Sequence, residues 1–328
     1  MTPKLWPYLR VLVGGGILVA LVLRLGSDAV AEGLRAIDAR AVLAALGIGL
    51  LTTVLSAWRW CLVAHGLGLS LPLGVAVADC YRALFLNSVL PVGVLGDVHR
   101  AVSHGRQAGD VGRGIRAVAL ERSASLLVSV IVGVAVVLSR PELLMAAIGP
   151  LVLGGWGVVG LVVVLAAVAA LGVWTVRGTH PSHIRAALRT GLADARTGVF
   201  SRGTWPGVVL LSVATLVGYL ALFVIAARAA GCRSPLGELL PLLVPGLLAM
   251  ALPLSIGGWG PREAVATVAF GAGGLGATLG FTAALVYGVL CLIACLPGGA
   301  LLLLRSSSQP VPARVGRSAG PSPGRADR

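Results

Sequence analysis

The chain has 328 residues, of which 57% are hydrophobic and 12% are charged, and its mean hydropathy is +0.95. Soluble domains carry about 25% charged residues, so this composition excludes an ordinary water-soluble enzyme, a disordered chain and a collagen-like fibre. The formal net charge of +14 does not indicate nucleic-acid binding by itself, because basic residues between apolar segments set the orientation of membrane proteins. The composition predicts an all-α polytopic membrane protein.

Six apolar runs are long enough to cross the hydrocarbon core of a bilayer, which takes about 20 helical residues. They cover residues 9–25, 41–64, 115–138, 147–175, 205–230 and 277–304. Within the first run, the apolar stretch from Val11 to Leu23 follows Lys4 and Arg10 and precedes Ala29-Val30-Ala31, as in a cleavable signal peptide. We favour an uncleaved first helix, because Arg24 ends the run early and the remaining chain is itself polytopic.

Two further segments, 73–113 and 238–273, begin apolar and are then interrupted by proline and glycine, so neither is expected to form one continuous helix. The residues expected to break the helices are Pro91, Gly93, Gly96, Pro253, Gly257, Gly258 and Gly260. A shift of 162 residues superimposes the two breaks, which indicates an internal repeat over about 41–138 and 205–304. Paired broken segments in corresponding halves are typical of transporters built from repeats.

The distribution of arginine predicts how these segments cross the membrane, since cytoplasmic loops carry the excess of Lys and Arg. If both broken segments crossed fully, the basic loops 99–116 and 177–204 would lie outside, against this rule. If both are re-entrant, the two loops lie inside, and the repeats have opposite orientations. We therefore predict about six spans and two re-entrant broken helices in an inverted repeat over 1–305, with both termini cytoplasmic and a disordered basic tail over 306–328.

Charged and amide side chains within the predicted membrane segments are the candidate site residues, because such groups are costly in a bilayer and usually face a cavity or a partner. The candidates for a headgroup cavity are Arg59, Asp79, Arg82, Asn87, Asp97, Arg100, Glu121, Arg122, Arg262 and Glu263. A helix that starts after a break presents its positive end, and an adjacent arginine adds bidentate phosphate recognition. This combination favours an anionic headgroup over a cation or a sugar.

Structural explanations compete with this hypothesis. Trp58-Arg59-Trp60 is typical of an interfacial anchor with a snorkelling arginine, and we favour that interpretation. Asp79 and Arg82 are spaced for an internal ion pair, and the other charged pairs could connect helices. Among the histidines, His99 is the one next to a break and is a weaker candidate. The five cysteines show no metal-binding spacing, and no cofactor is expected.

These residues resemble the lysylphosphatidylglycerol synthase transmembrane-region family, the flippase-like membrane domain also known from the multiple peptide resistance factor. The motifs that carry the resemblance are Trp58-Arg59-Trp60, Asn87 to Pro91, Gly96 to Arg100, Glu121-Arg122, Leu252 to Ser255 and Gly257 to Glu263. It covers about residues 9–304 and implies lipid translocation. The soluble aminoacyl-transferase domain of the full-length synthases is not part of this sequence, so the resemblance does not imply lysyl transfer.

The expected function is therefore binding or translocation of a phospholipid or polyprenyl-lipid headgroup in the cell membrane, with no enzymatic activity. In this hypothesis Arg100, Arg122 and Arg262 hold the phosphate, while Asp97, Glu121 and Glu263 pair with them or with a cationic headgroup. Two alternatives remain: a membrane-embedded lipid or glycosyl transferase, and a non-catalytic partner subunit of a lipid-modifying enzyme. The expected partners are anionic membrane lipids, with a second copy of the chain or a separate lipid-modifying enzyme as further possibilities, and not nucleic acid.

Overall fold

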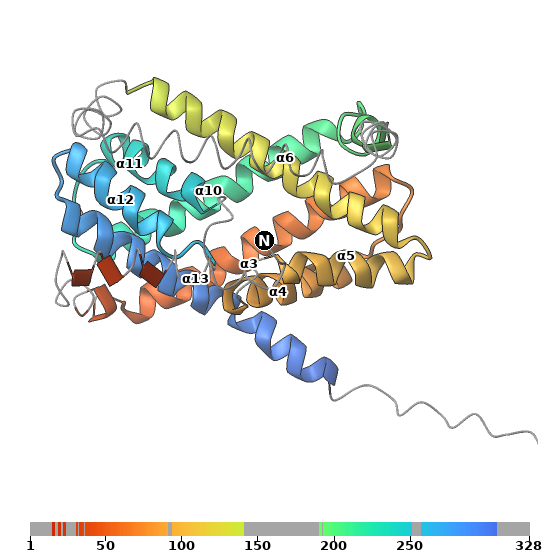
Figure 1. Cartoon of the computed structure of the whole chain (residues 1–328), viewed down its shortest axis with the longest axis horizontal. Helices are drawn as coiled ribbons and strands as arrows, with labels where there is room; N and C mark the ends of the chain where they lie inside the picture. The colour runs from red at the N-terminus through yellow and green to blue at the C-terminus, as the bar shows by residue number, and fades with distance from the viewer. Residues whose placement is uncertain are drawn as a thin grey trace, which may run out of the picture.

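The computed structural model describes residues 37–90, 94–140, 193–250 and 257–306, together with a few residues between 15 and 35 and residues 190 and 191. The regular structure within these ranges is α-helical (Figure 1). Several predictions fall largely or wholly outside the described residues: the spans over 9–25 and 147–175, Pro91, Gly93, Pro253 and the tail over 307–328.

Four described helices are long and apolar enough to cross a membrane. They are α3 (Ala39–Gly66), α6 (Val111–Leu138), α10 (Trp205–Ala229) and α13 (Ala277–Ser306). The corresponding predicted spans, 41–64, 115–138, 205–230 and 277–304, are thereby confirmed as long apolar helices. Large apolar side chains such as Leu127, Ile131 and Leu210 are exposed on these helices, as expected for surfaces that contact lipid. The chain is thus a multi-pass membrane protein.

The first predicted broken segment forms two short helices, α4 (Leu73–Val89) and α5 (Leu95–Gln107). They pack against one another in opposite directions. Gly96 at the start of α5 lies against Ala83 near the end of α4, and Arg100, one turn later, contacts Cys80, one turn earlier. The segment is therefore an antiparallel helical hairpin.

The second broken segment repeats this arrangement with α11 (Leu236–Ala249) and α12 (Pro261–Ala272). Gly258, just before α12, lies against Met250, while Gly273, just after α12, lies against Leu242. The order of a long helix, a hairpin and a long helix thus occurs twice, from α3 to α6 and from α10 to α13.

The two hairpins open toward opposite ends of the helical bundle. Helix α6 begins beside the end of α5, where Gly105 packs on Val111. At its other end, Arg140 donates to the carbonyl oxygen of Gly237 at the start of α11, at 3.5 Å. Because α6 has 28 residues, these contacts lie about 40 Å apart. That the hairpins are re-entrant in a membrane stays a prediction.

The two basic loops that the charge distribution assigns to one side of the membrane are in contact. Arg116 near the start of α6 forms an ion pair with Asp194 of the segment that precedes α10. Gly66 at the end of α3 packs directly on Gly198 of that same segment. The loops therefore lie at the same end of the bundle, as the prediction requires.

The predicted break glycines serve two different purposes. Gly257, Gly258 and Gly260 have φ angles of +56°, +84° and +98°, a backbone region that favours glycine, so they form the turn between α11 and α12. Gly96, by contrast, lies within α5, and its missing side chain allows the backbones of α4 and α5 to touch. The expectation that Gly96 provides the bend is corrected accordingly.

Candidate functional site

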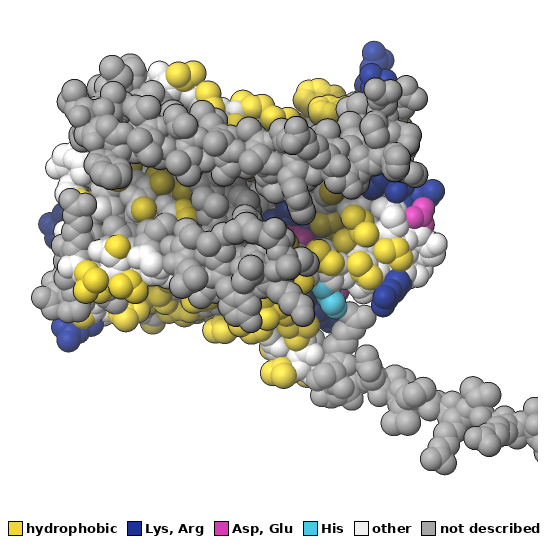
Figure 2. All heavy atoms as spheres, viewed as in Figure 1, with side chains coloured by type: hydrophobic (Ala, Val, Ile, Leu, Met, Phe, Trp, Pro, Cys, Tyr) yellow, Lys and Arg dark blue, Asp and Glu magenta, His cyan; other side chains and the backbone are white. Residues whose placement is uncertain are grey.

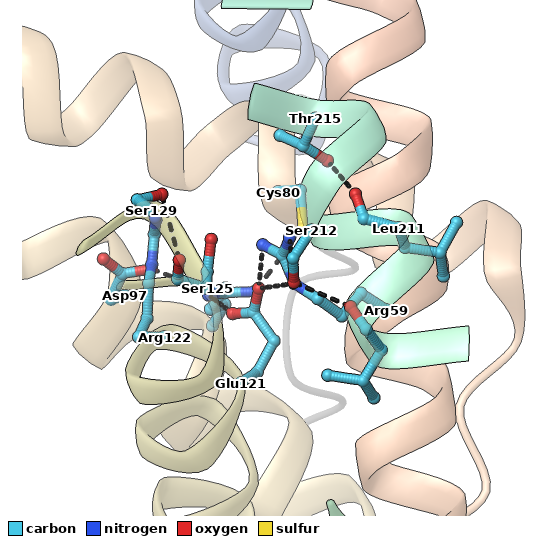
Figure 3. A network of polar contacts seen from close by, with 12 residues as sticks. Arg59, Cys80, Asp97, Glu121, Arg122, Ser125, Ser129, Leu211, Ser212 and Thr215 are labelled. Carbon is cyan, nitrogen blue, oxygen red and sulfur yellow. Dashed lines mark hydrogen bonds and ion pairs between the residues drawn. The ribbon is translucent and has the colours of Figure 1, made fainter. Parts of the chain in front are cut away.

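A single carboxylate holds two arginines together inside the first half of the bundle (Figure 3). Oε1 of Glu121 in α6 accepts hydrogen bonds from Nε and Nη2 of Arg59 in α3, at 2.9 and 2.5 Å. Its other oxygen, Oε2, accepts one from Nη2 of Arg100 in α5, at 2.8 Å. The three side chains are at most 2% exposed. Glu121 therefore connects α3, α5 and α6 through buried charges.

A second carboxylate, Asp97, extends this arrangement toward the first break. Its Oδ1 accepts from Nε of Arg100 at 2.9 Å and from Nε and Nη2 of Arg122 at 3.1 and 2.9 Å. Its Oδ2 accepts from the amide of Asn87 at 3.0 Å, and the Asn87 oxygen accepts the backbone N–H of Gly96.

These five residues form the charged cluster: Arg59, Asp97, Arg100, Glu121 and Arg122. The cluster holds three guanidiniums and two carboxylates, which leaves one positive charge without an acidic counterpart among its members. Buried ion pairs are costly to desolvate and persist where the geometry satisfies their hydrogen bonds, as it does here for Glu121. An arrangement with one excess positive charge favours an anionic ligand.

The predicted interfacial anchor at Trp58-Arg59-Trp60 is wrong for two of its three residues. Trp58 is 51% exposed and can face lipid, but Trp60 is fully buried and Arg59 is 2% exposed. Arg59 cannot snorkel because Glu121 and the hydroxyl of Ser212, at 3.3 Å from Nη1, hold it inside the bundle. The guanidinium of Arg100 lies 4.7 Å from the centroid of a Trp60 ring, in a cation–π contact.

Arg122 differs from the other two arginines of the cluster, because its side chain is 46% exposed. Its Nε and Nη2 both donate to Asp97, whose side chain is 17% exposed. Figure 2 shows basic and acidic atoms at the surface beside the apolar side chains over α5 and α6. Arg122 is therefore the exposed guanidinium of the charged cluster, whereas Arg59 and Arg100 are closed off.

Two other predicted residues, Asp79 and Arg82, form an ion pair on α4. Nη1 of Arg82 donates to Oδ1 of Asp79 at 2.7 Å, as the spacing of three residues predicts. The pair lines an open groove of about 490 Å³ between α4, the end of α5 and α13.

The second break has its own ion pair, formed by Arg262 and Glu263 at the start of α12. Nε of Arg262 donates to Oε1 of Glu263 at 3.0 Å, and Oε2 of Glu263 accepts the backbone N–H of Gly260 at 2.7 Å. The Arg262 guanidinium lies over rings of Trp259 and Tyr287, at 5.0 and 5.2 Å from their centroids. Both charged residues are 0% exposed, so Arg262 is enclosed and not open to a headgroup.

The two breaks approach one another in the middle of the bundle. Gly257 of the second break lies against the backbone of Ser88, in the last turn of α4. The tips of the hairpins therefore meet, as expected for paired broken helices. The charged cluster lies beside the first tip, and the Arg262–Glu263 pair beside the second.

Sequence reasoning missed several residues of this region. Ser212 and Trp60 contact the charged cluster, and Tyr287 encloses Arg262. His104 is 3% exposed and packs edge-on against Trp60 at 5.5 Å between ring centroids, whereas the suspected His99 is exposed on α5.

The part of the chain that the structure describes contains no group of three or more His, Cys, Asp or Glu side chains that could hold a metal ion. The family model for the lysylphosphatidylglycerol synthase TM region matches residues 8–299. No curated protein and no solved structure shows significant similarity to the chain.

Proposed function

Because the chain belongs to the lysylphosphatidylglycerol synthase transmembrane-region family, we propose that it is a flippase-like protein that binds and translocates an anionic lipid headgroup. The family relates the chain to lipid modification in membranes. The ligand class we propose is a phospholipid or a polyprenyl-lipid phosphate. The proposal includes a location in the cell membrane, cytoplasmic termini and no catalytic step.

The accessible guanidinium of Arg122 is the observation that carries this proposal. It lies in α6 beside the first hairpin tip, 46% exposed, within a cluster that has one more arginine than carboxylates. Arginine binds phosphate through two parallel hydrogen bonds, and its guanidinium sheds water more readily than an ammonium does. Intramembrane charges of this kind usually mark substrate pathways.

The arrangement of the hairpins supports alternating exposure of this site. The α4–α5 hairpin opens toward one end of the bundle and the α11–α12 hairpin toward the other, while Ser88 and Gly257 bring their tips together. A headgroup held between the tips would pass from one side to the other by limited movements of the hairpins, with the acyl chains remaining in lipid.

Reconstitution of the purified chain in vesicles tests the proposal. Fluorescent phosphatidylglycerol, aminoacylated phosphatidylglycerol and a polyprenyl phosphate would be placed in one leaflet, and their movement would be measured with a membrane-impermeant quencher. We expect faster movement of at least one anionic lipid than in protein-free vesicles, and a loss of roughly ten-fold in the Arg122→Gln variant.

The control is Arg113→Gln, which removes an arginine of the same helix whose side chain is 44% exposed and paired with Asp110 outside the charged cluster. This variant should move lipid at the unmodified rate. Rates equal to those of protein-free vesicles for all three lipids would falsify the proposed function. Mass spectrometry of the lipids that co-purify with the chain would identify the ligand directly.

A further inference from the structure

The hydrogen bonds of the charged cluster are unevenly shared between the two oxygens of Asp97. Oδ1 accepts three guanidinium donors, one from Arg100 and two from Arg122, whereas Oδ2 accepts the amide of Asn87. A carboxylate binds an arginine best when each oxygen takes one of two parallel N–H groups. Asp97 therefore holds Arg122 in a poorer geometry than a free two-oxygen anion could offer.

Asp97 would keep most of its partners if it released Arg122. Its Oδ1 would still accept from Nε of Arg100 at 2.9 Å, and its Oδ2 would still accept from Asn87 at 3.0 Å. Release therefore does not leave a buried carboxylate without hydrogen bonds, which is the costly outcome for such groups.

The accessible arginine and the excess charge indicate which anion could take the place of Asp97. Arg122 is the exposed guanidinium of the cluster, and Arg59 and Arg100 are held by the buried Glu121. One excess positive charge is neutralised by one negative charge. A lipid phosphodiester carries one such charge and presents two free oxygens to a guanidinium fork.

We propose, on the basis of the proposed function, that Asp97 competes with the lipid headgroup for Arg122. A monoanionic phosphodiester lipid displaces the Asp97 carboxylate from Arg122 and binds both of its donating nitrogens. The exchange removes one of the two ion pairs between α5 and α6, since Arg100 still binds Glu121, so the ligand loosens the attachment of the start of α5 to α6. Without ligand, Asp97 closes the site.

The competitor role predicts that removing the Asp97 carboxylate tightens binding, the opposite of what a ligand-binding residue shows. The affinity of the full-length chain in detergent would be measured by calorimetry with dihexanoyl phosphatidylglycerol, and with dihexanoyl phosphatidylcholine as the zwitterionic comparison. We expect Asp97→Asn and Asp97→Ala to bind phosphatidylglycerol about five-fold more tightly, and Arg122→Gln about ten-fold more weakly. The matched control Asp110→Asn, in a similar pair with Arg113 outside the cluster, should bind within about two-fold of the unmodified chain.

A second measurement uses the unmodified chain and does not depend on how the variants fold. Hydrogen exchange at the start of α5, residues 95–100, should become faster when phosphatidylglycerol is added, because the bond from Asp97 to Arg122 is lost. Faster exchange supports the competitor role, and slower or unchanged exchange in the presence of bound lipid overturns it.

The outcomes separate this inference from the proposed function. If the unmodified chain binds and moves phosphatidylglycerol but neither Asp97 variant binds it more tightly, the competitor role is wrong and the lipid function stands. If the chain moves only a polyprenyl phosphate, the phosphodiester assignment is wrong. If it moves none of the lipids, the proposed function fails, and the inference fails with it.

Discussion

Arg59 and Glu121, 62 residues apart in the sequence, form an ion pair in which both side chains are almost fully buried, with 2.5 Å between Nη2 and Oε1. The same carboxylate also binds Arg100. Glu121 thus compensates two guanidiniums that have no access to water, and its charge is a condition for the packing of α3, α5 and α6.

Replacing Glu121 tests this dependence. Glu121→Gln removes the carboxylate that binds Arg59 and leaves Arg100 with Asp97 as its acidic partner in the cluster. Removing one partner of a buried ion pair costs about 3–5 kcal/mol. We expect a markedly lower midpoint of thermal unfolding for the variant in detergent. The same substitution at the exposed Glu238, in the first turn of α11, should cost less than about 1 kcal/mol. Equal midpoints for the two variants would contradict the role of Glu121.

The close approach of α4 and α5 makes a second prediction, at Gly96. A Cβ atom at this position would overlap the carbonyl oxygen and the Cα of Ala83, which are backbone atoms and cannot move aside alone. Gly96→Ala should therefore separate the two helices, lower the yield of folded protein and weaken the contacts of Asp97. Gly74→Ala in α4 is the control, because nothing lies within 4 Å of its added Cβ. It should leave stability unchanged or slightly improved.

Helix α13 makes a comparable approach to the second ion pair at Gly288. An added Cβ would overlap Nη2 of Arg262 and the indole of Trp259, and Arg262 is enclosed on its other side by packed residues. We expect Gly288→Ala to lower the unfolding midpoint and to displace Trp259, which a change in tryptophan fluorescence would report. Gly271→Ala in α12 meets only Ala277 at an ordinary 3.7 Å and should behave like the unmodified chain. A normal fluorescence spectrum for Gly288→Ala would refute the close packing.

The predicted topology can be tested by labelling introduced cysteines in a variant whose five native cysteines are replaced. A cysteine at Arg106, in the last turn of α5, should react with a membrane-impermeant reagent only from the cytoplasmic side. A cysteine at Arg140, after α6, should react only from outside. Labelling of the Arg106 position from outside would overturn the re-entrant arrangement of the first hairpin.

The sequence alone predicts the elements of this fold well, because their signals are local. Runs of apolar residues mark α3, α6, α10 and α13, and the proline and glycine clusters mark both hairpin turns. Charged residues in apolar surroundings mark the candidate site, since such groups are costly in a bilayer and usually face a cavity or a partner.

The partners of those charges could not be predicted from the sequence, because pairing depends on how distant helices pack. Trp58-Arg59-Trp60 has the local pattern of an interfacial anchor, and only the position of Glu121 on α6 shows that Arg59 is internal. Likewise, nothing near Arg122 and Arg262 in the sequence tells which is accessible, although the first is 46% exposed and the second is enclosed. Accessibility is a property of the assembled bundle.

Helix α13 contacts each hairpin through its backbone at a glycine. Gly298 lies directly against the backbone of Tyr81 in α4, and Gly280 lies directly against Ala266 in α12. At such backbone contacts neither helix can slide or rotate without a clash, since packed interfaces are not continuously deformable. A tilt of either hairpin would therefore press on α13, which through these contacts connects the two halves of the protein.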